Sequence, residues 1–133
     1  MELKAVADYL EAQGQGVMAE TIFIGEMPAD CTAGVLLMDR YSGTSIDPYL
    51  PKYRHTGFRV AIRNADYELG KLHAKAINRA LYIRFDTQLP GILVKQMIPQ
   101  NDPRPYRRSV GGYWEFEVDF ECSYVIDDPD LAL

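Results

Sequence analysis

Residues 114–126 read WEFEVDFECSYVI, and this stretch decides the fold because apolar and polar residues alternate along all of it. Strand side chains point to opposite faces of a sheet with a period of two. One predicted face is apolar and consists of Trp114, Phe116, Val118, Phe120, Cys122, Tyr124 and Ile126. The other carries four acids, Glu115, Glu117, Asp119 and Glu121, together with Tyr113, Ser123 and Val125. The alternation predicts one long strand with a buried face and a charged face.

Two other segments have the periodicity of helices. Residues Leu3, Val6, Ala7 and Leu10 recur at i, i+3, i+4 and i+7, and Gly14 and Gly16 then end the predicted helix. A second helix is predicted from Asn64, as its N-cap, to about Leu81, with Asp66 and Glu68 in its first turn. Its expected buried stripe is Leu69, Leu72, Ala76 and Ala80, with Ile77 and Leu81 beside it. Gly70 either weakens this helix by about 1 kcal/mol relative to Ala or permits close packing on the sheet.

The remaining apolar runs predict shorter strands, at 21–24, 35–38, 57–63, 83–85 and 93–98. Two stretches rich in Pro, Gly or Ser are expected to be irregular loop arms, at about 41–53 and 99–112. The tail, residues 127–133, is expected to fray. The order of these elements predicts a single α+β domain over residues 1–133, in which two α-helices pack on one face of a mainly antiparallel, twisted β-sheet.

The charge of the chain is unevenly distributed along the sequence. The net charge of −5 combines −6 over residues 1–51, +8 over 52–108 and −7 over 109–133. Two interpretations stay open: acidic and basic strands lie side by side and neutralise each other, or opposite faces carry opposite charge so that copies attract head to tail. No apolar run approaches the roughly 20 residues that span a bilayer, and the acidic N-terminal stretch lacks the pattern of a signal peptide. We therefore expect no membrane association and a chain that stays where it is made.

The sequence shows little of the chemistry that enzymes use. Alternate acids on one strand lie about 6.6–7 Å apart, too far for neighbours to chelate one ion, so no metal site is predicted. No glycine-rich nucleotide-binding pattern is present. His55 and His73 lie in no recognisable nucleophile motif, and a surface or interface role is expected for both. Cys31 and Cys122 are expected to be reduced, partly buried thiols, with a disulfide as the alternative. The sequence predicts no catalytic residue, metal or cofactor.

Two stretches are instead typical of interaction surfaces. The 41–53 arm carries aromatic and aliphatic side chains that a loop leaves uncovered. Among them, the interface candidates are Tyr49, Leu50 and Tyr53. The 99–112 arm carries a basic cluster with an aromatic residue: Arg104, Tyr106, Arg107 and Arg108. This cluster suits phosphate contacts, as in a DNA-binding regulator, or acids on a neighbouring subunit. The sequence pI of about 5.0 favours the protein contact.

The order of these segments resembles the tail terminator, or minor capsid, proteins of long-tailed (siphovirus-type) bacteriophages. The resemblance lies in the first helix followed by TIFIGEMP at 21–28, in AGVLLMDR at 33–40 and in the loop with Gly43 and Pro48. It continues in the strand and helix GFRVAIRNADYELGKLHAKAINRAL at 57–81 and in IPQNDPRPYRRSVGGYWEFEVDFECSYVI at 98–126.

This resemblance implies a structural virion protein and no enzyme. Subunits of the family form a ring, expected to be six-fold, at the head-proximal end of the tail, after assembly in the host cytoplasm. The ring caps the tail tube protein, stops its polymerisation and joins the tail to a head-completion or neck protein. Genomic DNA passes through the lumen without sequence-specific binding. The alternatives are a neck connector protein of the same virion and a small metal-dependent nuclease.

The acids of the long strand are the candidates for the lumen of such a ring. An acidic lumen repels DNA and lets it slide. Glu115, Glu117, Asp119 and Glu121 are the residues concerned. The alternative is that they pair with Arg59 and Arg63 across the sheet.

Overall fold

The structure, a computed structural model of the 133-residue chain, describes residues 1–107 and 111–131 and leaves the side chains of residues 106 and 107 undescribed. The helices are α1 (Leu3–Ala12) and α2 (Tyr67–Leu81). The strands are β1 (Ile22–Ile24), β2 (Ala33–Asp39), β3 (Tyr53–Asn64), β4 (Thr87–Leu89), β5 (Ile92–Pro99), β6 (Arg104–Arg107) and β7 (Trp114–Ile126). They form one sheet in the order β1-β2-β3-β7-β5-β4, with β6 also paired to β7.

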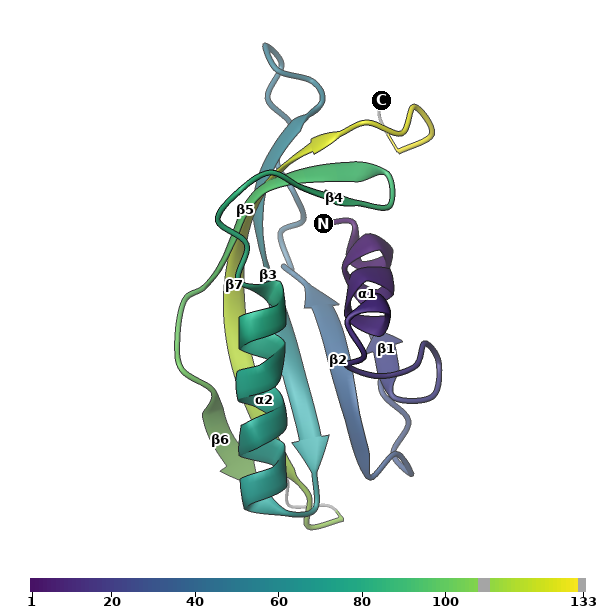
Figure 1. Cartoon of the computed structure of the whole chain (residues 1–133), viewed down its shortest axis with the longest axis vertical. Helices are drawn as coiled ribbons and strands as arrows, with labels where there is room; N and C mark the ends of the chain where they lie inside the picture. The colour runs from purple at the N-terminus through teal and green to yellow at the C-terminus, as the bar shows by residue number, and fades with distance from the viewer. Residues whose placement is uncertain (108–110, 132–133) are drawn as a thin grey trace.

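The architecture confirms the predicted α+β class. Strands β1 and β2 pair in parallel, and every other strand pair is antiparallel. Both helices lie over the same face of a sheet that curls around them (Figure 1). No helix among the described residues is long and apolar enough to cross a membrane.

Strand β7 is the centre of the sheet and has the bounds that its alternation predicts. It pairs with β3 along its whole length on one side, and with β5 and then β6 on the other. Its even-numbered residues from Phe116 to Ile126 are buried in the core. Phe120 stacks on Phe58 of β3, with ring centroids 5.2 Å apart. The helices cover this face of the sheet and bury it in the core, which explains why the strand has one fully apolar face.

Helix α2 begins two residues later than predicted. Asp66 is its N-cap, and the Asp66 carboxylate accepts the Leu69 N–H at 3.0 Å. Asn64 instead accepts the Asp66 N–H at 2.9 Å and still belongs to β3. Both side chains are good local acceptors, but the long pairing of β3 with β7 keeps Asn64 in the strand.

The buried face of α2 also differs from the predicted one. Gly70, Ala74, Ile77 and Leu81 are buried. Leu69 and Leu72, which were expected in the core, are 59% and 60% exposed. A Cβ on Gly70 would lie 2.7 Å from a ring carbon of Phe116. Gly70 therefore permits the predicted close packing on the sheet, and this contact turns the two leucines outward.

Two predictions on the strands need correction, and a third strand has an irregularity that was not predicted. Residues 83–85 form a single bridge, Ile83 to Met97, and the strand β4 follows them. Strand β6 lies inside the 99–112 segment, which was expected to be irregular. Strand β5 is as predicted, but an irregularity at Lys95 shifts its register against β7. The extra residue lets both Val94 and Met97 point into the core.

The predicted arms and tail are partly ordered by backbone contacts. Strand β3 starts at Tyr53, so the 41–53 arm ends there. The N–H groups of Asp127 and Asp128 donate to the Gly91 carbonyl at 3.1 and 3.2 Å. Fraying of the 127–133 tail stays a prediction.

Candidate interaction surfaces

The sheet face opposite the helices carries a row of ion pairs, here called the arginine–carboxylate ladder. Antiparallel pairing places Arg63 opposite Glu115 and Arg59 opposite Asp119. Its contacts are Arg63 with Glu115 at 3.1 Å, Arg59 with Glu117 at 3.0 Å and with Asp119 at 2.8 Å, Arg104 with Asp119 at 3.0 Å, and Arg40 with Glu121. Four acids thus face four arginines. Neutralisation between neighbouring strands is confirmed for this face.

The Arg63–Glu115 pair is the buried end of the ladder. Arg63 and Glu115 are 3% and 4% exposed. A second guanidinium nitrogen of Arg63 is also bonded, because Nη1 donates to the carbonyls of Pro28 and Cys31 at 2.9 and 3.1 Å. A buried ion pair is tolerated only when additional hydrogen bonds satisfy its charges. Arg63 therefore ties the loop before β2 to the sheet.

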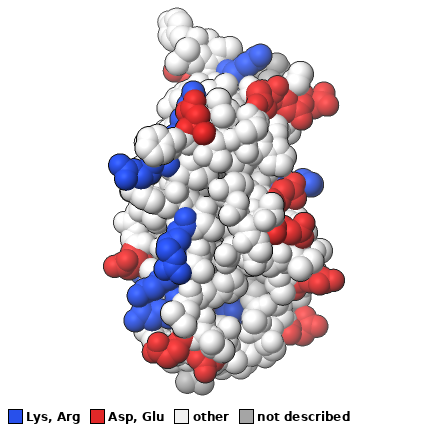
Figure 2. Space-filling view, viewed as in Figure 1, with Lys and Arg blue, Asp and Glu red and all other residues white. Residues whose placement is uncertain are grey.

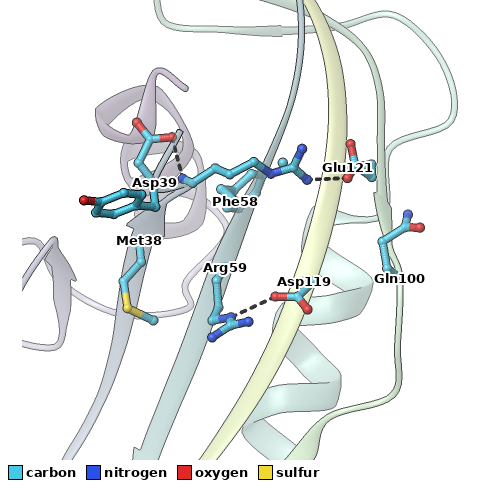
Figure 3. Close-up of a pocket in the computed structure, with 10 residues that line it drawn as sticks. Met38, Asp39, Phe58, Arg59, Gln100, Asp119 and Glu121 are labelled. Atoms are coloured by element: carbon cyan, nitrogen blue, oxygen red, sulfur yellow. Dashed lines mark hydrogen bonds and ion pairs between the residues drawn. The ribbon is translucent and has the colours of Figure 1, made fainter. Parts of the chain in front are cut away.

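The exposed end of the ladder borders a groove of about 570 Å³ between β2, β3 and β7. Glu121 and Asp119 face this groove (Figure 3). A Cβ on Gly57 would overlap the Arg40 guanidinium, so Gly57 is what lets Arg40 cross β3 and reach Glu121. The acids that line this groove are therefore paired with arginines.

The pKa of one carboxylate in this groove, that of Asp119, is shifted by its neighbours. Burial raises the pKa of Asp119, but hydrogen bonds from Arg59 and Arg104 outweigh that effect and hold the pKa below its ordinary value. In the part of the chain that the structure describes, no group of three or more His, Cys, Asp or Glu residues is arranged to hold a metal ion. Glu117 and Asp119, two acids of the ladder, both bind Arg59.

His55 has a serine neighbour that sequence reasoning missed. Its Nδ1 lies 2.7 Å from Ser123 Oγ, and its Nε2 lies 3.4 Å from Glu121. The cross-strand register of β3 and β7 brings them together. A nucleophilic serine needs an accessible hydroxyl and backbone N–H groups free to stabilise an oxyanion. Ser123 is buried in a strand paired on both sides, so the contact is typical of a structural hydrogen bond.

The other residues with potential reactivity are buried or partly buried. Burial lowers the pKa of His73 on α2, opposed in part by a hydrogen bond to the Gln15 backbone. Both cysteines are free thiols, as predicted. Burial raises the pKa of Cys122 to about 12, which keeps this thiol protonated and unreactive.

The structure separates the two predicted interface clusters. Tyr49 and Leu50 lie on the 41–53 arm and are 90% and 56% exposed, whereas Tyr53 is half-buried at the start of β3. Arg104 lies on β6 and is held by Asp119. Tyr106 and Arg107 also belong to β6, and Arg108 lies outside the described residues.

The distance between these clusters follows from strand pairing. Tyr53 is opposite Val125, and Arg107 is opposite Trp114, so the clusters lie at opposite ends of β7 (Figure 1). At about 3.3 Å per residue, the separation is roughly 36 Å. The two clusters therefore form two surfaces and no single patch.

The helix side of the molecule has separated charges. Acidic side chains follow the flank formed by α1 and β1, and Lys and Arg side chains follow α2 (Figure 2). The acidic flank consists of Asp8, Glu11, Glu20, Glu26 and Asp30, and residues 5–38 contain no base. The basic face of α2 consists of Lys71, Lys75 and Arg79, and residues 69–85 contain no acid. Neutralisation between strands thus describes the sheet face, whereas on the helix side acidic and basic side chains gather on different flanks. Attraction between copies stays a prediction.

Comparison with known proteins identifies a family and a similar fold. No curated protein matches the chain. A protein from a solved structure titled "Virion of native gene transfer agent (GTA) particle" has a similar fold, with a TM-score of 0.62 and 14% identity over 91% of this chain and 93% of that one. The family model described as bacteriophage tail terminator protein matches residues 9–126, which include every helix and strand except the first turns of α1. The chain therefore belongs to the bacteriophage tail terminator family and is a structural protein of the virion.

Proposed function

We propose that this chain is the subunit of a ring that caps the tail tube at its head-proximal end. The ring stops polymerisation of the tail tube protein and offers its other side to a head-completion protein. The match of residues 9–126 to the tail terminator family carries this proposal. A six-fold ring is the expected stoichiometry.

The surfaces of the subunit suit a protein that bridges two partners. The 41–53 arm leaves large apolar side chains uncovered at one end of the molecule, among them Tyr41, Ile46, Tyr49 and Leu50. Beneath the arm, Tyr49, Leu50 and Val125 line an apolar hollow of about 410 Å³. Buried Arg54 holds the base of the arm by donating to the carbonyls of Pro51 and Tyr53. Exposed aromatic groups on a firmly held loop favour a protein partner.

The charge of the subunit is compatible with DNA that passes through the ring. The chain has a net charge of −5, which opposes tight binding to a phosphate backbone. The ladder acids remain our candidates for the lumen. Because they are paired with arginines, they would present balanced charges to DNA rather than a bare acidic surface. We expect no sequence-specific DNA binding.

Adding the purified chain to polymerising tail tube protein tests this function directly. We expect shorter tubes that carry a ring at one end in electron micrographs. The variant Y49S/L50S should cap less well, and the control Y82S/F85S, which removes exposed apolar surface outside the 41–53 arm, should cap normally. Tube lengths that the chain leaves unchanged would contradict the proposal. Binding to a head-completion protein without any binding to the tube would instead identify a neck protein.

A further inference from the structure

Helix α2 presents an outward surface that the subunit itself does not cover. Leu69 and Leu72 are 59% and 60% exposed on it. Lys71, Lys75 and Arg79 lie beside them, and none of these three bases forms an ion pair within residues 1–107 and 111–131. The surface thus has an apolar centre and a mainly positive border, with Glu68 at its N-terminal end.

The flank of α1 and β1 has the opposite charge. Val17 and Ile24 are 47% and 40% exposed there. Glu11, Glu20 and Glu26 are exposed along the same flank, which Figure 2 shows as a line of acidic side chains. Strand β1 is also the edge of the sheet, and among the described residues no further strand pairs with its outer side. This flank has an apolar centre and a negative border.

We propose that the outward face of α2 docks onto the α1–β1 flank of a second copy of the chain. The inference rests on the proposed ring, for which it names the two contacting surfaces. Apolar centres at Leu72 and Ile24 exclude water, and the surrounding charges attract and orient the copies. Two different surfaces meet in such a contact, which is the heterologous kind that closes into rings.

The charges also argue against a symmetric contact between two α2 helices. Such a contact places Lys71, Lys75 and Arg79 of one copy near the same bases of the other, and Glu68 in the first turn is the one acid of the helix that could offset them. Like charges that face each other across an interface are strongly unfavourable. The acid flank of a neighbour is therefore the better occupant of the α2 surface.

A charge exchange tests the contact. We expect K75E/R79E, and separately E20K/E26K, to weaken self-association by about tenfold or more. The combination of all four changes should restore it, because the charges attract again with reversed sign. D102K/D130K changes the net charge by as much as E20K/E26K does, on exposed residues that belong to neither α2 nor the α1–β1 segment, and should associate as the wild type does.

Sedimentation at low salt, for the chain alone and with tail tube protein present, separates the outcomes. A wild-type chain that associates, with reversal variants that associate equally well, would overturn this contact and leave the ring standing. Weakened variants that the four-fold exchange fails to restore would also overturn it. A wild-type chain that stays monomeric in both conditions would overturn the contact and the ring together. Circular dichroism verifies that each variant is folded.

Discussion

Removal of the buried charge at Glu115 should destabilise the fold more than removal of an exposed ladder charge. Breaking a buried ion pair from one side costs about 3–5 kcal/mol, because a charge stays behind without compensation. Glu115→Gln keeps the shape of the side chain and leaves Arg63 its two carbonyl acceptors, Pro28 and Cys31. We therefore expect the free energy of unfolding to fall by about 3 kcal/mol, the lower end of this range. Arg63→Met removes all three contacts, and we expect about 5 kcal/mol.

The double variant R63M/E115Q is the decisive measurement. It leaves neither charge of the pair in the interior, so its loss should be well below the sum of the single losses. We expect a coupling energy of at least about 2 kcal/mol. The matched control is R59M/D119N, whose partners are bonded at 2.8 Å but have side chains 47% and 38% exposed. Exposed pairs contribute at most about 1 kcal/mol.

Urea unfolding followed by fluorescence is the suitable assay. The chain has one tryptophan, Trp114, which lies next to Glu115 and packs edge-on against Tyr67 with ring centroids 5.0 Å apart. Urea is preferred to guanidinium chloride because a salt screens ion pairs. A coupling energy below about 0.5 kcal/mol for the buried pair would refute the reasoning, since additive losses indicate independent sites.

Three further predictions concern the core and its titrating groups. Gly70→Ala should lower the stability measured in urea. Overpacking against Phe116 costs about 1–3 kcal/mol, which exceeds the gain in helix propensity of about 1 kcal/mol. A more stable variant would contradict the close contact of Gly70 with Phe116. Burial lowers the pKa of His73 below 6.5, so the unfolded chain binds the proton more readily than the native chain. The free energy of unfolding should therefore fall as the pH drops through 6.5 toward the lower native pKa, and His73→Gln should lose this decrease. Cys122 should resist alkylation until the chain unfolds, whereas the partly exposed Cys31 should react in the native state, as mass spectrometry can show; equal native rates would contradict the burial.

The sequence alone was sufficient where a pattern is local and long. The alternation of residues 114–126 predicts β7 from its first to its last residue, because thirteen positions with a period of two match no other regular structure. The periodicity of Leu3, Val6, Ala7 and Leu10 likewise predicts α1 and its buried face. The resemblance to the tail terminator family rests on these segments and on those between them, and the family match confirms it.

The tertiary structure decided everything that depends on which segments meet. The register of β3 against β7 selects the partner of each ladder acid and brings His55 to Ser123. Packing of Gly70 on Phe116 decides which side of α2 is buried and leaves Leu69 outside. Local periodicity determines that a segment is a helix or a strand. The rotation of that helix and the pairing of that strand are determined by contacts between residues far apart in the chain, and these contacts create the surfaces through which this protein is proposed to act.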